Sequence, residues 1–207
     1  MTIIYELSSE FDDLPHATRE WRQHEKEYYN CKICQKLNRI KLYPAQIDVA
    51  VKEMTSDKAI YMAVWYAKAT LFHIQFIEQI RSYMDDYVFG KCYLSDGSLI
   101  KEYVTCYKKD FIVIRGTCGT EYNECLGCRS VGSIVEGPKY VLSSYLKEKK
   151  IHQDSIQHLY IDESVINSID FSPWPDVVLE PIEVRDEPVD QRRLICDPPN
   201  PSWKYVQ

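Results

Sequence analysis

Apolar residues recur along this chain in two spacings, one typical of strands and one typical of helices. Residues 2–7 alternate loosely and begin with Ile3-Ile4-Tyr5, which predicts a first strand. The longest periodic stretch begins at Ser56-Asp57, a favourable N-cap with an acid in the first turn. It predicts one long helix over about 56–86, ending before Gly90. Its helical spacing is carried by Ile60, Val64, Ala67, Leu71, Ile74, Ile77 and Met84, and a second apolar face by Trp65, Phe72, Phe76 and Ile80.

After residue 90 the pattern changes to short runs that favour strands. Two runs, 91–94 and 99–107, flank the turn Ser95-Asp96-Gly97-Ser98 and predict a hairpin. Pro181 favours a sheet edge for its strand, because proline cannot donate a ladder hydrogen bond. The other elements predicted are strands at 39–43, 110–115, 156–161 and 176–184, short helices through 48–54 and 162–166, and a glycine-punctuated loop over 116–127.

Together these elements predict an α+β fold with mixed or antiparallel sheets and one long helix. We interpret residues 1–207 as a single domain, since this length suffices for one sizeable core. Its sub-regions are a part made of 1–55 and 91–150, a helical insertion at 56–90, and a C-terminal strand–helix–strand unit with a proline-rich tail at 151–207.

Negative charge is concentrated near the end of the chain. The net charge is −6, and the stretch from Asp176 to Asp190 carries six acids against one arginine. An acidic protein is a poor binder of nucleic acid, whose phosphates require Lys and Arg, whereas an acidic stretch attracts basic proteins. We predict a partner surface here, with a solvated loop as the plain alternative. Its residues are Asp176, Glu180, Glu183, Asp186, Glu187 and Asp190.

The sequence has neither a basic, apolar leader at its start nor an apolar run long enough for a membrane span. We therefore expect a cytosolic protein that contacts no membrane. In a reducing compartment, eight cysteines indicate metal ligands or buried thiols rather than disulfides.

Four cysteines form two Cys-x-x-Cys pairs, and four thiolates delivered in this way suit a tetrahedral Zn²⁺. Because 90 residues separate the pairs, one shared ion would join the N-terminal region to the middle of the chain. Four cysteine ligands leave no position for water, so the predicted zinc is structural; unmetallated thiols are the alternative. The predicted ligands are Cys31, Cys34, Cys125 and Cys128. Cys92, Cys106, Cys118 and Cys196 stand singly and are interpreted as buried hydrophobes, with Cys118 near enough to Cys125 to exchange with a ligand.

No sequence motif indicates catalytic activity. The nucleophile-elbow, zinc-protease and phosphate-loop motifs are absent, so we predict no enzyme. Asp85-Asp86 is interpreted as a solvated pair at a helix end, and His73 as a packed or surface residue. A site assembled only in three dimensions stays open, and a pocket holding perturbed carboxylates or histidines would favour it.

The order of these motifs resembles a known family. The first Cys-x-x-Cys pair is followed by Leu42-Tyr43-Pro44 and an acid. Later come a strand ending in Arg115-Gly116, the second Cys-x-x-Cys pair and Tyr140-Val141-Leu142. A strand, short helix and returning strand close the pattern, at 159–165 and 179–184. This arrangement resembles the double-CXXCG-motif family of bacterial immunity proteins, although Gln35 and Arg129 stand where that family has glycine.

The resemblance implies a protein that neutralises a cognate toxin of a polymorphic toxin system by stoichiometric contact and needs no catalytic residue. A basic toxin would suit the acidic stretch. The alternative is a zinc-ribbon module that binds nucleic acid or has a regulatory role. Nucleic-acid binding would require a basic groove.

Overall fold

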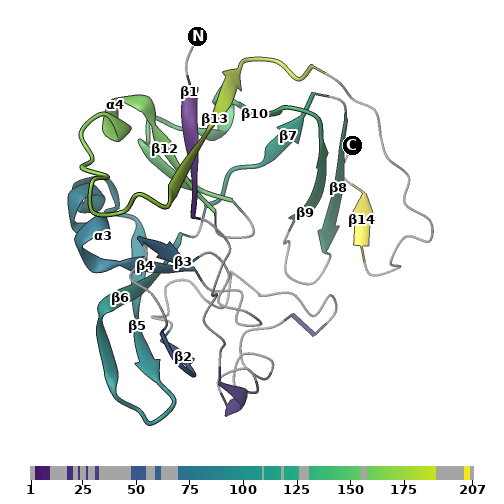
Figure 1. Cartoon of the computed structure of the whole chain (residues 1–207). Helices are drawn as coiled ribbons and strands as arrows, with labels where there is room; N and C mark the ends of the chain where they lie inside the picture. Colours follow the sequence, from purple (N-terminus) through teal and green to yellow (C-terminus); the bar gives the residue numbers. More distant parts are fainter. Residues whose placement is uncertain are drawn as a thin grey trace.

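We analysed the protein as a computed structural model that describes residues 3–9, 18–20, 23, 27, 31–32, 48–54, 59–61, 70–108, 110–117, 119–125, 131–154, 158–189 and 203–205. Within these residues the protein is mostly β, with two mixed sheets, one of them curled as a half-barrel, and one short helix (Figure 1). The prediction of mixed or antiparallel sheets is confirmed, whereas the α+β class with a long helix is not.

The larger sheet has six strands in the order β11-β12-β1-β13-β10-β7. β1 lies at its centre and pairs antiparallel with β12 and β13, while β10 pairs parallel with β13. Its strands are β1 (Ile3–Ser9), β7 (Ile114–Gly116), β10 (Lys139–Leu142), β11 (Ile151–Gln153), β12 (Leu159–Asp162) and β13 (Val177–Arg185). The strands expected near 2–7, 156–161 and 176–184 are thereby confirmed.

Pro181 lies in an interior strand rather than at the sheet edge that we predicted. β13 is flanked by β1 and β10, and Pro181 pairs with Tyr5 of β1. The register explains how proline is tolerated there. β10 pairs with β13 only from Glu183 to Arg185, so at Pro181 β13 has one strand neighbour among the described residues.

The second sheet has five strands in the order β2-β5-β6-β4-β3. Its centre is the hairpin predicted around residues 95–98, in which β5 (Tyr87–Leu94) pairs antiparallel with β6 (Leu99–Lys108). Gly97 has a φ of +85°, a conformation that glycine adopts without strain. The other strands are β2 (Val49–Val51), β3 (Ile60–Tyr61) and β4 (Leu71–His73).

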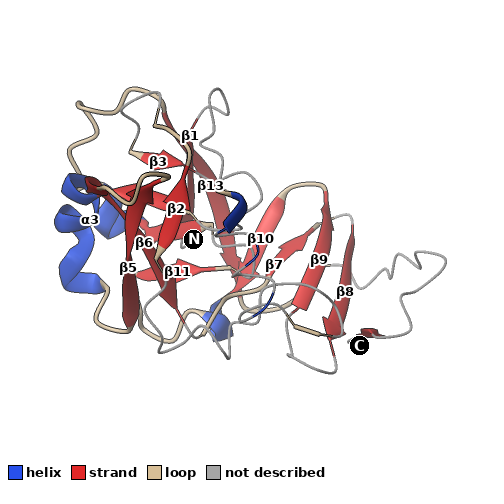
Figure 2. Cartoon of the chain, turned by 90° about the horizontal axis from the view of Figure 1, so that it is seen from below, coloured by secondary structure: helices blue, strands red, loops and turns tan. Residues whose placement is uncertain are grey.

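A third, smaller sheet has the order β14-β8-β9. It is formed by β8 (Gly119–Cys125), β9 (Val131–Glu136) and β14 (Trp203–Tyr205). Figure 2 shows β7, β8 and β9 on one side of the molecule, and the β5–β6 hairpin with its helix on the other. The loop predicted over 116–127 is therefore wrong for the part that forms β8.

The long helix predicted over 56–86 is wrong. Its described residues begin with β3 and β4, and only then comes α3 (Ile74–Ile80), continued by the 3₁₀ turn η1 (Arg81–Tyr83). All three residues of β4 are buried, because apolar clusters cover both of its faces: Phe72 lies in the core between the two large sheets and Leu71 in a separate cluster. A strand covered on both faces is apolar at every position and cannot be told from a buried helix by periodicity. A similar error affects 48–54, where β2 replaces the expected short helix.

One hydrophobic core joins the two large sheets. It contains Leu7, Leu159 and Ile161 from the first sheet and Phe72 and Cys106 from the second. The helices α3 and α4 (Glu163–Ile166) close it, and the side chain of Asp162 caps α4 as the acid at 162 predicted. His73, buried at the start of α3, packs its ring against Tyr103 and Trp174, so its interpretation as a packed residue is confirmed.

We predict that Phe76→Ala lowers the free energy of unfolding by about 3–5 kcal/mol, because it removes a fully buried ring that packs edge-on against Trp174. Urea unfolding followed by tryptophan fluorescence measures the change. Leu99→Ala, at an exposed position of the hairpin, is the control and should cost less than about 0.5 kcal/mol. Equal losses in the two variants would contradict this account of the core.

Candidate functional site

Two of the four predicted zinc ligands lie outside the described residues. Cys31 is described and buried, and Cys125 is described only as the last residue of β8. Cys34 and Cys128 fall outside the described ranges. Among the residues that are described, no three His, Cys, Asp or Glu side chains gather closely enough to hold a metal ion.

Two of the single cysteines lie in the hydrophobic cores, as expected. Cys92 and Cys106 are buried, and burial raises the pKa of the Cys92 thiol to about 12, so this thiol stays protonated at neutral pH. A protonated, buried thiol is neither a nucleophile nor a metal ligand. Cys118 and Cys196 lie outside the described residues.

Five of the six predicted partner acids are described, and they are spread along β13 instead of forming one cluster. Glu180 and Glu183 are an odd number of residues apart, so their side chains point to opposite faces of the sheet. Asp176 and Asp186 flank the nine residues of β13 and are therefore about 30 Å apart. Asp190 lies outside the described residues.

Some of these acids do gather with others at the N-terminal end of β1. Register places Asp162 of β12 beside Ile4, and Glu183 of β13 beside Ile3. Ion pairs with Lys150 and Arg185 already engage Asp162 and Glu183. We call this group the acidic sheet end; it consists of Asp162, Glu163, Glu183, Asp186 and Glu187.

A network of charged side chains crosses the middle of the larger sheet. Glu6 of β1, only 4% exposed, accepts from Lys139 at 2.9 Å and from His158 Nδ1 at 2.8 Å. Lys139 also contacts Glu180 at 2.9 Å, and His158 Nδ1 lies 3.5 Å from Asp154. Burial alone would raise the pKa of Glu6, but the hydrogen bonds from His158 and Lys139 lower it to about 2. Glu6 is therefore ionised, and the network fixes four neighbouring strands.

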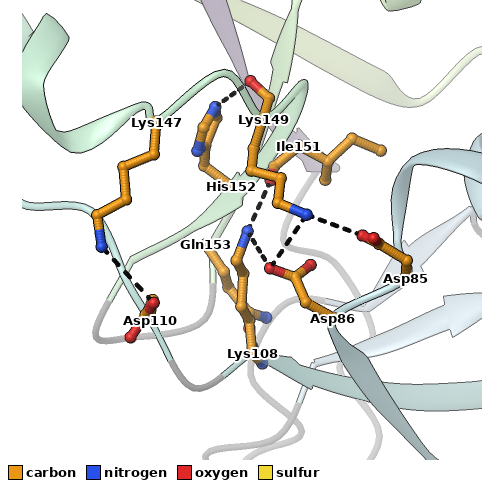
Figure 3. Close-up of polar contacts among 9 residues, drawn as sticks. All are labelled: Asp85, Asp86, Lys108, Asp110, Lys147, Lys149, Ile151, His152 and Gln153. Carbon is orange, nitrogen blue, oxygen red and sulfur yellow. Dashed lines mark hydrogen bonds and ion pairs between the residues drawn. The ribbon is translucent and has the colours of Figure 1, made fainter.

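A second charged cluster lies where the two large sheets meet, and Lys108 is at its centre (Figure 3). Lys108, the last residue of β6, pairs in register with Tyr87, which brings it next to Asp86. Its ammonium group lies 3.1 Å from Asp86 Oδ2 and donates to the backbone oxygen of Ile151 at 3.2 Å. The Lys108 side chain is only 6% exposed. It thus holds a buried positive charge between β6 and β11.

Buried polar side chains extend this connection. Gln153 of β11 accepts from the backbone N–H of Lys108 at 3.1 Å and donates to the backbone oxygen of Cys106 at 3.3 Å. Lys149 lies 3.0 Å from Asp85 and 3.9 Å from Asp86. The interpretation of Asp85-Asp86 as a solvated pair is therefore wrong for Asp86, whereas Asp85 is 75% exposed and agrees with it.

His152 of β11 is the histidine of this cluster. Burial lowers its pKa to about 4, and the positive charge of Lys108 contributes to the shift. The ring is therefore neutral at pH 7. Nε2 lies 3.0 Å from the backbone oxygen of Lys149. Because a carbonyl oxygen only accepts, Nε2 carries the proton and Nδ1 is left as an acceptor.

These residues surround a pocket of about 450 Å³. Its polar lining comes from β5–β6, η2 (Ser143–Tyr145) and β11, segments far apart in the sequence. A histidine with a perturbed pKa in a pocket is the kind of feature that would favour a site assembled only in three dimensions. Its lining residues are Asp86, Lys108, Asp110, Phe111, Ile112, Ser144, Tyr145, Leu146, Lys147, Lys149 and His152.

A scan against protein-family models and a search of curated proteins each found no match to this chain. No helix within the described ranges is long and apolar enough to cross a membrane.

We predict that His158→Gln lowers the free energy of unfolding at pH 6 by about 1.5–3 kcal/mol, the range for a hydrogen bond to a charged group. Burial alone would lower the pKa of His158, but its hydrogen bond to Glu6 and the charge of Asp154 raise it above 6.5. The stabilisation is therefore complete below pH 6.5 and is lost as pH rises through the folded pKa. Urea unfolding from pH 5 to pH 9 should show the variant's deficit shrink with rising pH.

The matched control is His152→Gln, whose effect should have the opposite sign of pH dependence. The pKa of His152 is about 4 in the folded protein against 6.5 ordinarily, so the unfolded chain binds the proton first as pH falls. Wild-type stability should then drop by up to about 3 kcal/mol between pH 6.5 and 4, and the variant should lack this drop. Two variants with the same pH profile would contradict both assignments.

Proposed function

We propose that this protein is a bacterial immunity protein that binds a cognate toxin in the cytosol and neutralises it by stoichiometric contact. The observation that carries the proposal is the charge of the C-terminal strand–helix–strand unit. From His158 to Val189 the chain has eight carboxylates and one arginine, and no lysine. Such a surface attracts a basic protein and speeds the encounter.

The acidic sheet end is the part of this unit that we propose for toxin contact. Asp162 and Glu183 have basic partners within the chain, but Glu163, Asp186 and Glu187 have no ion pair with any described residue. All three of these are exposed. Glu163 begins α4, and Asp186 and Glu187 follow β13 directly, so rigid elements present the charges.

The sequence alternative, a module that binds nucleic acid, is less well supported. Phosphate binding needs an uncompensated run of Lys and Arg. The three lysines of the sheet junction are instead held by Asp85, Asp86 and Asp110. Lys139 and Lys150 are likewise paired with acids.

A structural zinc is part of the proposal. Cys31, Cys34, Cys125 and Cys128 would hold the ion, and the buried thiol of Cys31 fits a closed site. The ion would supply no chemistry; it would tie the segment after β1 to the end of β8.

We predict that the toxin encoded beside this protein forms a one-to-one complex with it and loses activity. Asp186→Lys/Glu187→Lys should slow association by about tenfold or more at low salt, because both charges would repel a basic partner. Surface plasmon resonance at several salt concentrations measures the rates. Glu53→Lys/Glu102→Lys changes the net charge equally at exposed sites of the other sheet and is the control. Absence of a complex with the wild-type protein would refute the proposed function.

For the metal, we predict about one zinc per purified chain. Cys31→Ser/Cys125→Ser should abolish zinc binding and lower the melting temperature, since metal binding contributes to folding stability. Cys92→Ser, at a buried thiol outside the predicted ligand set, should lower stability without loss of zinc. Elemental analysis and thermal unfolding with and without a chelator distinguish the cases. Metal-free wild-type protein with stability unaffected by chelator would exclude the structural zinc.

A further inference from the structure

We propose that the pocket at the sheet junction binds a small organic anion that has a planar apolar body and an N–H or O–H donor. The inference is independent of toxin binding, because the acidic sheet end does not contribute to this pocket. It stands on the shape of the pocket, on an unpartnered acceptor atom of the buried residue His152, and on the cation at its exposed rim.

The pocket has the size and the walls of a site for a small molecule. Its volume of about 450 Å³ falls within the range of known ligand sites. Phe111, Ile112 and Leu146 supply apolar walls, and Tyr145 adds an aromatic ring. Such walls favour a flat, apolar body over a hydrated inorganic ion.

His152 supplies a directional polar contact on the inner side. Its residue is 3% exposed, and its neutral ring is oriented by the bond from Nε2 to Lys149. Nδ1 has no hydrogen-bond partner among the described residues, and it is not a fully buried atom. In Figure 3 the ring lies between the side chains of Lys147 and Lys149. An acceptor held in this way requires a ligand that donates.

Lys147 is the cation of this pocket that is most available to an anion. Lys108 and Lys149 also line the pocket, but Asp86 and Asp85 hold them in closer ion pairs. Lys147 and Asp110 are 3.7 Å apart, and both are more than two-thirds exposed, so their ion pair is weak. Lys147 can therefore exchange Asp110 for a ligand carboxylate or phosphate at little cost. Ser144, also exposed in the lining, offers a hydroxyl to the same group.

The backbone at the opening is held in an unusual conformation. Lys147 has a φ of 43° and Glu148 a φ of 60°, in the left-handed region that side chains other than glycine and asparagine rarely adopt. Such strain persists only where the surroundings enforce it, and it is concentrated at functional sites. Here it comes one residue after η2, beyond Leu146, and sets the position from which the Lys147 side chain leaves the backbone.

These contacts define how the ligand would lie. Its anionic group faces Lys147 and Ser144 at the exposed rim, its apolar body lies against Phe111 and Leu146, and its donor meets Nδ1 of His152 inside. A para-substituted aromatic acid has this arrangement in its simplest form.

The test is a titration of the full chain with 4-hydroxybenzoate and the longer 4-hydroxyphenylacetate, followed by calorimetry and by NMR of the His152 ring. Benzoate lacks the donor, and inorganic phosphate lacks the body. We expect at least one of the two hydroxy acids to bind and to shift the His152 signals, and benzoate and phosphate to bind at least tenfold more weakly, as the loss of a hydrogen bond to a buried acceptor implies.

Three variants locate the binding. His152→Gln keeps an N–H for the Lys149 oxygen but removes the Nδ1 acceptor, and Lys147→Ala removes the rim cation; each should weaken binding at least tenfold. Lys150→Ala changes an exposed lysine that pairs with Asp162 outside the pocket, and should leave the affinity unchanged. Far-ultraviolet circular dichroism confirms that each variant is folded.

Several results would overturn the inference. One is the absence of any shift at His152 with either hydroxy acid at about 10 mM, a concentration that would reveal even millimolar affinity. Another is phosphate binding as tightly as the aromatic acids. A third is affinity that is unchanged in both folded variants, His152→Gln and Lys147→Ala. The toxin-binding experiment is unaffected by all three, so the two proposals fail separately.

Discussion

The relative position of the two large sheets depends on a positive charge that is almost entirely buried, that of Lys108. Lys108 ends β6 with its ammonium group between Asp86 and the backbone of β11, and it approaches the ring of Tyr87. A buried charge is tolerated only when it is paired and hydrogen-bonded, so β5, β6 and β11 have one arrangement in which Lys108 is satisfied. Gln153 also fixes β11 against β6, but with a neutral side chain. Its amide oxygen and its amide nitrogen both form hydrogen bonds with the backbone of β6. The apolar core supplies the attraction between the sheets, and these polar groups determine their relative position.

Burial lowers the pKa of both histidines near this core, and their neighbours decide the final direction of each shift. His158 and His152 both lie close to acids and lysines, yet the pKa of His158 is raised and that of His152 is lowered. His158 donates directly to the ionised Glu6, whereas His152 donates to a backbone oxygen and lies near the ammonium of Lys108. Below its raised pKa, His158 therefore contributes a positive charge to a structural network. The other stays neutral and presents an acceptor to a pocket.

Local signals in the sequence predicted the local structure well. The hairpin at 95–98, the strand from Val177 and the short helix after Asp162 follow from turn residues, alternation and a capping acid, which act over a few positions. The error at 56–86 came from residues that are apolar all round, where burial on two faces removes the period that distinguishes strand from helix. The polar contacts at the sheet junction could not be predicted from the sequence, for a different reason. Lys108 and Gln153 are 45 positions apart, so only tertiary pairing brings them together. The two Cys-x-x-Cys pairs, with members outside the described residues, stay a prediction.

The short overlap of β10 with β13 has a consequence for the protein in a crowded cell. From Val177 to Pro181 that flank of β13 faces no described strand. An unpaired strand edge is a template on which a strand of another molecule can add. Pro181 lies within this stretch. The pairing of β13 with β1 continues unbroken before and after Pro181, so the proline nitrogen, which cannot donate, points away from β1 toward the unpaired side. Glu180, tied to Lys139, adds a charge at the same place. Pro181, which we predicted at a sheet edge, thus occupies a position of β13 with no described neighbour on one side, and there it offers no backbone donor to an added strand.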